Sequence, residues 1–357
     1  MATPLAHTVE CTDGIDLHPQ VAWLPFVWDG PLAQFSDGTL VTLDSHETHR
    51  SADGGVTWSS TPTFPRDRTT NEIKPSREMS LCVTRKGTLV AAFMNLNERY
   101  GLGWDENRHD GALDCRLPQY VMRSTDGGRS WSKPLMLHEA WTGEVRDLIE
   151  TRSGRLVLSS MRFLHHPGRH SVVSYVSDDD GESWQNAQTI DLGGKGHHGG
   201  VTEASIEQLK DGRVWMLLRT NWGFFWQAFS EDEGFTWRDI RPSKIACASA
   251  PGMVKRLRSG RLMLLWNRPY PEGETTFPMS GGDGNWSEVP VSNHRSQLSL
   301  AFSEDEGVSF SQPIMIASRK PTEWLSYPRV LERQAGEVWV TTMQGGLHVR
   351  LHEADFV

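Results

Sequence analysis

The sequence lacks the features that would place it in several common protein classes. No apolar run approaches the roughly 20 residues needed to cross a bilayer, so we expect neither a transmembrane helix nor a membrane partner. Residues 1–16 are polar and show no apolar core of a signal peptide, which predicts a cytoplasmic protein. With 36 basic and 45 acidic residues the net charge is −9, without the basic excess that binding of nucleic acid requires.

Metal-binding and disulfide patterns are missing as well. The four cysteines are scattered without CxxC spacing, and no pair of histidines has the spacing of metal ligands. A chain of 357 residues is long enough to bury a core of its own without disulfides. We therefore expect free thiols, no metal and no cofactor.

Long helical segments are also absent, because 33 glycines and 19 prolines interrupt the chain throughout. What the chain contains instead is a repeated motif, Ser-x-Asp-x-Gly-x-(Thr/Ser)-(Trp/Phe). In this motif Asp accepts hydrogen bonds from amides of its own turn, Gly supplies a positive φ, and the aromatic residue packs between sheets. We interpret each Asp as structural. The five copies begin at Ser51, Ser124, Ser177, Ser230 and Ser303.

A second repeat is a β-hairpin that precedes each motif and has an apolar strand on either side of a glycine turn. The turn glycines are Gly38, Gly87, Gly154, Gly212, Gly260 and Gly336. Six units of four strands predict an all-β, six-bladed propeller that forms a single domain over residues 1–357. The last unit has no motif of its own, so we expect its fourth strand from the N-terminus, around residues 5–10 or 21–23, which closes the ring.

The inner strands of a propeller line its axis, so residues at one repeat offset converge at one end of the ring. The position nine residues before each turn glycine holds Asp29, Glu78, Val145, Glu203, Pro251 and Tyr327. Buried carboxylates are costly unless they are paired or solvated, which favours a polar pocket at this level. A slip of one residue in the third unit brings Arg146 and Asp147 to the same level.

Four arginines are expected at the rim of the same pocket. They are Arg219, seven residues after a turn glycine, and Arg116, Arg169 and Arg295, each eight residues before a motif serine. Acids and guanidinium groups together suit an anionic, sugar-like ligand, because Arg binds carboxylates with two hydrogen bonds. Two alternatives stay open: Asp29 and Glu78 pair with arginines in a structural network, and Arg116 and Arg169 are structural rim residues.

Two long insertions, residues 95–116 and 267–295, are expected to border the pocket, as long irregular loops in compact domains commonly border functional sites. His197 and His198 lie in the Gly-rich segment GGKGHHGG and either contact a ligand or belong to a surface loop. The candidates for stacking on a sugar ring, with plain packing as the alternative, are Tyr100, Trp104 and Trp222.

These repeats, together with the segments VTEASIEQLKDGRVWMLLRT and NHRSQLSLAFSEDEG, resemble the sialidase (neuraminidase) superfamily over nearly the whole chain. The resemblance implies that Tyr327 is a nucleophile assisted by Glu203. It also implies that Arg219 and Arg295 are the second and third arginines that bind the carboxylate of sialic acid. The first unit departs from the family, because VWDGPLAQF places Asp29 where the family has its first arginine.

The family also uses an acid/base aspartate, for which Asp44 and Glu47 are candidates by position alone. The resemblance implies an exo-acting glycoside hydrolase that removes a terminal, acidic sugar from a glycan. One alternative is a glycosidase in which two of Asp29, Glu78 and Glu203 act as acid and base while Tyr327 and the arginines bind substrate. The others are a polysaccharide lyase with Tyr327 or a histidine as base, and a propeller that only binds glycan or protein.

Overall fold

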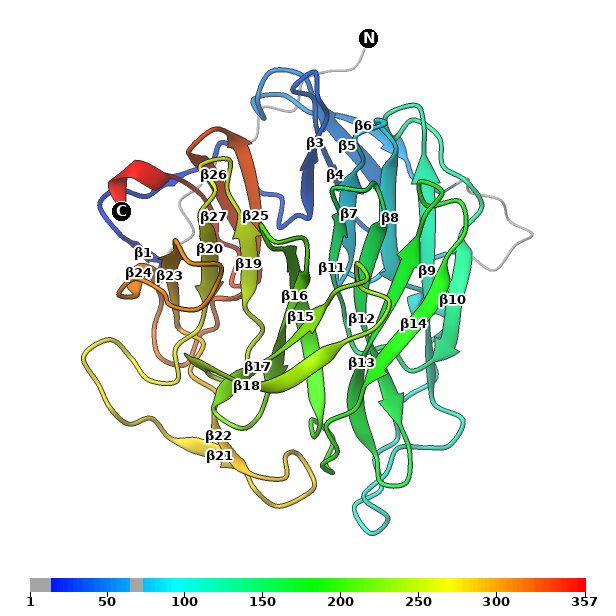
Figure 1. Cartoon of the computed structure of the whole chain (residues 1–357), viewed down its shortest axis with the longest axis vertical. Helices are drawn as coiled ribbons and strands as arrows, with labels where there is room; N and C mark the ends of the chain where they lie inside the picture. The colour runs from blue at the N-terminus through cyan, green and yellow to red at the C-terminus, as the bar shows by residue number, and fades with distance from the viewer. Residues whose placement is uncertain (1–13, 65–72) are drawn as a thin grey trace.

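A computed structural model describes residues 14–64 and 73–357. Six antiparallel sheets are arranged as blades around a central axis, with the first strand of each blade innermost (Figure 1). The all-β, six-bladed propeller that the repeats predict is confirmed. No helix among the described residues is long and apolar enough to cross a membrane. The two short 3-10 helices are η1 (Leu96–Glu98) and η2 (Glu353–Asp355).

The strands follow one another from the axis outward in every blade. Blade one contains β3 (Leu32–Gln34), β4 (Leu40–Leu43), β5 (Glu47–Ser51) and β6 (Ser59–Pro62). Blade two contains β7 (Ser80–Val83), β8 (Leu89–Met94), β9 (Arg116–Ser124) and β10 (Leu135–Ala140). Blade three contains β11 (Val145–Glu150), β12 (Leu156–Leu164), β13 (Arg169–Ser177) and β14 (Gln185–Ile190).

The remaining blades are built in the same way. Blade four contains β15 (Val201–Gln208), β16 (Val214–Thr220), β17 (Phe224–Ser230) and β18 (Arg238–Ala246). Blade five contains β19 (Met253–Arg256), β20 (Leu262–Trp266), β23 (Gln297–Ser303) and β24 (Ile314–Ser318). Blade six contains β25 (Ser326–Gln334), β26 (Glu337–Gln344) and β27 (His348–His352). A separate hairpin projects from blade five and consists of β21 (Met279–Gly281) and β22 (Pro290–Ser292).

Two short strands near the N-terminus join different blades. β1 (Asp16–Leu17) pairs with β24, so blade five has five strands rather than the four that the repeat predicts. β2 (Ala22–Trp23) pairs with β27 and is the outermost strand of blade six. The other candidate for that position, residues 5–10, lies outside the described residues. Residues 16–23 therefore contact two adjacent blades.

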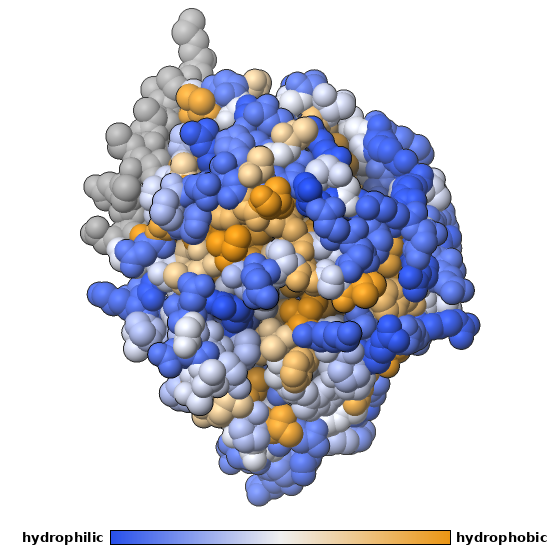
Figure 2. Space-filling view, turned by 60° about the vertical axis from the view of Figure 1, so that its left-hand side comes forward, coloured by the Kyte–Doolittle hydropathy of each residue, from blue (hydrophilic) through white to orange (hydrophobic). Residues whose placement is uncertain are grey.

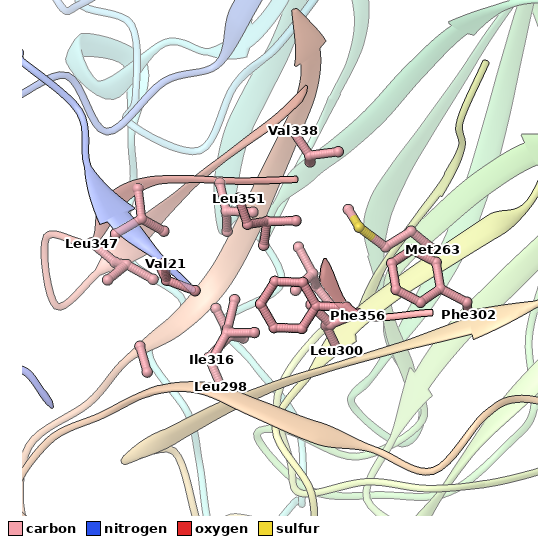
Figure 3. Packing of buried hydrophobic residues seen from close by; sticks show 14 of the residues in the cluster. Val21, Met263, Leu298, Leu300, Phe302, Ile316, Val338, Leu347, Leu351 and Phe356 are labelled. Atoms are coloured by element: carbon pink, nitrogen blue, oxygen red, sulfur yellow. The ribbon is translucent and has the colours of Figure 1, made fainter. Parts of the chain in front are cut away.

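The hydrophobic core lies between the blades, because each sheet packs both faces against its neighbours. The second strands accordingly read as continuous apolar runs, such as LVAAFM in β8 and LMLLW in β20, and are buried along their whole length. Figure 3 shows the cluster between blades five and six. Its labelled members are Val21, Met263, Leu298, Leu300, Phe302, Ile316, Val338, Leu347, Leu351 and Phe356.

One side of the molecule is largely hydrophilic at its surface. Figure 2 shows the side of the molecule that lies at the left of Figure 1, where hydrophilic side chains cover most of the surface and apolar side chains gather near the middle. This distribution agrees with a core that the blades share internally.

The repeated motif forms the turn between the third and fourth strands and fixes each blade to the one before it. In blade four, Asp232 accepts hydrogen bonds from the Thr236 amide at 2.8 Å and the Thr236 hydroxyl at 2.7 Å. Trp237 crosses to blade three, where its Nε1 donates to the Ser174 hydroxyl at 2.8 Å. Burial opposes ionisation of Asp232, but its hydrogen bonds lower its pKa, so the carboxylate in this turn stays ionised. The geometry confirms that this Asp is structural.

The fifth motif ends in Phe310 instead of Trp, and Phe310 lines a groove at the outer edge of the ring. The groove, of about 870 Å³, lies between blades four and five, where Trp215, Phe229 and Trp266 form its apolar walls.

We predict that Trp237→Ala lowers the free energy of unfolding by about 3–5 kcal/mol, because it opens a cavity between blades three and four and removes a hydrogen bond. Phe235→Ala in the same turn is the matched control, since Phe235 is 38% exposed and should change stability by no more than about 0.5 kcal/mol. Urea unfolding measures both variants. Equal losses would show that the turn as a whole, rather than the aromatic contact, carries the effect.

Candidate active site

The candidate site lies at the end of the ring opposite the glycine turns. Glu203 is near the start of β15 and Arg219 near the end of β16, so both are at the far end of their hairpin from Gly212. Tyr327 is at the start of β25. The two long insertions project from the same end, at the bottom of the view in Figure 1.

Glu203, Arg219 and Tyr327, which the sequence analysis placed in the pocket, form one buried hydrogen-bonded cluster. Nη1 of Arg219 lies 2.8 Å from both carboxylate oxygens of Glu203. The phenol of Tyr327 donates to Glu203 Oε1 at 3.0 Å and accepts from Arg219 Nη1 at 3.2 Å. Arg219 Nη2 donates to the Ser249 hydroxyl at 2.8 Å. The carboxylate is therefore paired and also holds the phenol.

The charges of this cluster determine which of the two groups carries the proton in the resting site. Burial opposes ionisation of Glu203, but the adjacent Arg219 and the hydrogen bond from Tyr327 lower its pKa to about 2. Burial and the neighbouring Glu203 charge raise the pKa of Tyr327 well above its ordinary value of 10. At neutral pH the pair is consequently an ionised carboxylate that accepts a hydrogen bond from a neutral phenol.

Irregular backbone aims both of these side chains into the pocket. Glu203 sits in a β-bulge, because Thr202 pairs with Arg219 while Ala204 pairs with Leu218. A bulge adds one residue to a strand and redirects its side chain. Tyr327 has a φ of 62°, a left-handed conformation that residues with a Cβ rarely adopt and that often occurs at functional sites.

Arg295, which corresponds to the third arginine of the sialidase superfamily, lies beside this cluster. Its guanidinium donates to the backbone carbonyl of Ser249 and, at 3.3 Å, to the side chain of Gln344. It stacks on the ring of Trp324 at 4.6 Å and lies 5.8 Å from the centre of the Tyr327 ring. Burial and the nearby Arg219 lower its pKa to about 10, so it remains a cation at neutral pH.

Trp324 is a residue that sequence reasoning missed. It is 44% exposed and carries the Arg295 guanidinium on its face. An exposed aromatic ring beside a buried cation is suited to stacking on a sugar ring. Trp324 lies in an irregular segment before β25, where no repeat offset distinguishes it from other exposed residues.

Two more buried arginines, Arg146 and Arg329, lie along the axis of the ring. Arg146 extends from blade three across the axis and donates to the carbonyls of Pro328 at 2.7 Å and Gly252 at 3.2 Å. Arg329 in blade six donates to the carbonyl of Arg77 in blade two at 2.7 Å. A cavity of about 390 Å³, lined by the inner strands of all six blades, contacts both arginines along the axis.

Glu144 is the second residue that sequence reasoning missed. Blade three has a bulge at Arg146, because Val145 pairs with Ser160 while Asp147 pairs with Ser159. Val145 therefore enters the core between blades, and the acid at the pocket is Glu144, ten residues before the turn glycine instead of nine. Asp147, which the one-residue slip was expected to bring to the same level, is instead hydrogen-bonded to the neighbouring strand β15.

Asp29, predicted as catalytic, lies in a structural network between blades one, two and six. Its carboxylate forms an ion pair with Arg77 and lies 3.2 Å from Nε2 of His348. Its carbonyl accepts from Thr341 at 2.8 Å. Burial opposes ionisation, but His348 and Arg77 outweigh it and lower the pKa of Asp29. The acid is thus ionised and paired, and no contact among the described residues joins it to Tyr327.

Arg116 and Arg169 lie outside the catalytic cluster. The side chain of Arg116 is 50% exposed and pairs with Glu139 on the neighbouring strand at 3.0 Å. Arg169 forms two hydrogen bonds to Asp191 of its own blade, at 2.9 and 2.5 Å. Each guanidinium is bound to a carboxylate of its own sheet, which favours the alternative of structural rim residues.

The predicted aromatic residues are not gathered at the cluster either. Trp222 packs on Trp226, with ring centres 5.4 Å apart, at the hairpin tip of blade four. Trp104 packs against the core between blades two and three and contacts His197 edge-on. Tyr100 is exposed. Among the described residues, none of these three has a recorded contact with Tyr327 or Glu203.

Asp44 and Glu47 belong to the turn before β5. One oxygen of Asp44 accepts from the amides of His46 and Glu47 at 2.7 Å, and the other lies 2.9 Å from His49. Burial opposes ionisation, but these hydrogen bonds lower the pKa of Asp44 to about 2. Asp44 therefore closes a turn and holds no proton to donate at neutral pH, which removes the position-based argument for it as the acid.

The insertion from blade five packs against the Gly-rich segment that contains His197 and His198. The amides of His197 and His198 donate to the carbonyls of Asn285 and Trp286, each at 2.7 Å. Asn221, at the end of blade four's hairpin, donates to the carbonyl of His198 at 3.0 Å. The Gly-rich segment is therefore held between the insertion and the strands that carry the catalytic cluster.

The described residues contain no group of three or more His, Cys, Asp or Glu side chains arranged to hold a metal ion. Within the same part of the chain, Cys82, Cys115 and Cys247 carry free thiols. Burial raises the pKa of Cys247 and that of Cys82, the latter to about 12, so both thiols stay protonated.

Six blades, five Asp turns and a buried Tyr–Glu–Arg cluster at the opposite end define a propeller of the sialidase type. The model of the BNR repeat-like domain matches residues 113–340, and the chain belongs to this family within the sialidase superfamily. A sialidase of Micromonospora viridifaciens is 27% identical over 231 residues, which cover 59% of this chain and 34% of that protein. The chain thus spans about a third of the length of this curated relative.

Solved structures share the fold at low identity. A protein of unknown function from Dyadobacter fermentans has a TM-score of 0.63 at 17% identity and covers 95% of this chain and 99% of its own. The NanB sialidase of Streptococcus pneumoniae has a TM-score of 0.61 at 14% identity, over 98% of this chain and 72% of its own. The intramolecular trans-sialidase of Ruminococcus gnavus has a TM-score of 0.54 at 15% identity, over 91% and 94%.

We predict that Arg219→Gln lowers the free energy of unfolding at pH 7 by about 3–5 kcal/mol, because it leaves the buried Glu203 charge without a partner. Arg116→Gln removes an exposed pair and should cost no more than about 1 kcal/mol. Urea unfolding at several pH values measures both.

The difference between wild type and Arg219→Gln should narrow as the pH falls. In the wild type, the lowered pKa of Glu203 gives stability above its unfolded value of 4.5 that is lost as the pH falls toward 2. In the variant, burial without Arg219 raises that pKa, so a proton relieves the cost. A penalty that stays constant from pH 7 to pH 4 would contradict the assigned role of this ion pair.

Proposed function

We propose that the protein is an exo-acting glycoside hydrolase that removes a terminal anionic sugar, of the sialic acid type, from a glycan. The observation that carries the proposal is the 3.0 Å hydrogen bond from the Tyr327 phenol to the ionised Glu203. Arg219 and Arg295 lie beside it and are suited to bind a substrate carboxylate with charge-assisted hydrogen bonds. The long insertion from blade five favours a pocket for a chain end over an open groove.

In the first step, Tyr327 Oη forms a bond to the anomeric carbon while its proton passes to Glu203. The bond from the anomeric carbon to the leaving oxygen breaks, and that oxygen takes a proton from an acid of the site. In the second step water attacks the anomeric carbon, gives a proton back to that acid, and releases Tyr327, which regains its proton from Glu203. The net reaction is hydrolysis.

A neutral nucleophile suits a substrate whose anomeric carbon carries a carboxylate, because a carboxylate nucleophile would meet an anion of the same charge. Sialidases are the tyrosine exception to glycosidases that use two carboxylates. The local charges of this site agree with that chemistry, since the phenol is neutral and the charge of Glu203 is paired with Arg219.

Asp29, at the position of the family's first arginine, leaves Arg219 and Arg295 as the arginines of a carboxylate clamp. Its negative charge is compensated by Arg77 and by the hydrogen bond to His348. Repulsion between Asp29 and a bound carboxylate is therefore reduced, and an acidic sugar remains the preferred substrate class in this proposal.

We predict that the purified protein cleaves a 4-methylumbelliferyl sialoside, and that Glu203→Gln and Tyr327→Phe each lower kcat at least about 100-fold. Tyr120→Phe is the matched control, because Tyr120 also donates to a glutamate, Glu98, at 2.7 Å but lies in blade two. It should keep its activity.

The same fluorogenic assay includes neutral and uronic acid glycosides. Cleavage of one of these alone would replace the sialic acid assignment with another glycosidase specificity. Absence of cleavage across the panel would overturn the hydrolase proposal in favour of elimination or glycan binding.

A further inference from the structure

Glu144 is a deeply buried acid without a bonded partner. It is 2% exposed, and among residues 14–64 and 73–357 its carboxyl group forms no hydrogen bond and no ion pair. Its backbone is fixed, since its carbonyl accepts from the Met161 amide at 3.0 Å. Buried polar groups without partners are costly, so a buried carboxyl group of this kind calls for an explanation.

Glu144 directly precedes β11, so it lies at the far end of its hairpin from Gly154, as Glu203 lies at the far end of its hairpin from Gly212. Its nearest acidic neighbours in electrostatic effect are Glu78 and Glu203, and its charge also acts on Tyr327. Arg146 and Arg329 are the cations that face it from blades three and six. Glu144 therefore enters the same end of the ring as the nucleophile, from a neighbouring blade.

We propose that Glu144 is the general acid of the reaction and donates its proton to the leaving oxygen. This inference rests on the proposed function and deepens it. In the first step the carboxyl proton moves to the departing oxygen as the glycosidic bond breaks, which leaves Glu144 ionised. In the second step the carboxylate takes a proton from the attacking water and is restored.

The charge states of the two acids support this division of roles. Burial, with the nearby Glu78 and Glu203 charges, raises the pKa of Glu144 well above its ordinary value of 4.5. Glu203 is ionised because of Arg219. Environments that push the pKa values of two carboxyl groups apart are typical of an acid and a base within one site.

The other acids near the pocket fit the role less well. Asp29 is bound to Arg77 and His348, and Asp44 is bound within its own turn. Both carboxylates are therefore already paired with groups of the protein. Glu78 is only partly buried, at the end of blade two. Glu144 is buried, and its carboxyl group forms no hydrogen bond or ion pair with any described residue.

The test compares two leaving groups on the same sugar. Methylumbelliferone is an acidic phenol that departs without protonation, whereas the alcohol of sialyllactose needs a proton. We expect Glu144→Gln to lower kcat on sialyllactose by about 100-fold to 10,000-fold. On the aryl sialoside it should lower kcat by less than about tenfold, since the acid contributes little there.

Matched variants separate the outcomes. Glu207→Gln, which changes a buried acid at the other end of β15, should leave both activities unchanged. Tyr327→Phe should lower both activities equally. The assignment of Glu144 would be overturned if Glu144→Gln lowered kcat equally on the two substrates. It would also be overturned if Glu78→Gln, instead of Glu144→Gln, lowered kcat selectively on sialyllactose. Failure of the proposed function itself would show differently, as an inactive wild type.

A second measurement does not depend on activity. If Glu144 keeps its proton in the folded state, the unfolded chain alone loses a proton as the pH rises past 4.5, and the wild type loses stability. Glu144→Gln avoids that loss, so its Tm should exceed that of the wild type by a margin that grows from pH 5 to pH 8. A margin that shrinks or reverses over this range would also overturn the proposal.

Discussion

The buried ion pair between Glu203 and Arg219 is the interaction on which the rest of the site depends. Either charge alone would be costly at this depth, because the interior replaces water with groups that solvate it poorly. Once paired, the carboxylate still holds the phenol of Tyr327, and the guanidinium still holds Ser249. Arg295 donates to the backbone of the same serine. One polar chain thus joins blades four, five and six.

The fold and much of this cluster were predictable from sequence because a propeller repeats its geometry. A fixed distance from each turn glycine located Glu203 and Tyr327 at one level, and the matching distance after the turn located Arg219. Glu144 escaped because the bulge of blade three falls at Arg146, one residue closer to its turn glycine than the bulge of blade four. Where a bulge falls depends on packing against neighbouring blades, which local sequence does not reveal.

The charge state of each acid was the part that the sequence did not reveal, because partners come from other blades. Asp29 shares its repeat offset with Glu203, yet its partners are Arg77 from the adjacent blade and His348 from the last one. Burial and the nearby acids Glu78 and Glu203 raise the pKa of Glu144, whereas the pKa of Asp29 is lowered. The pKa values of acids at one end of the ring thus shift in opposite directions through contacts with other blades, with no difference in local motif.

The distance between the glycine turns and the pocket has a practical consequence for handling the protein. The two features occupy opposite ends of the same hairpins, as Gly212 and the Glu203–Arg219 pair show in blade four. The turn at Gly87 has open space around its Cα. A linker inserted there would immobilise the protein on a sensor chip with the Glu203–Arg219 end facing the flowing solution, so that large solutes could reach it without obstruction from the support.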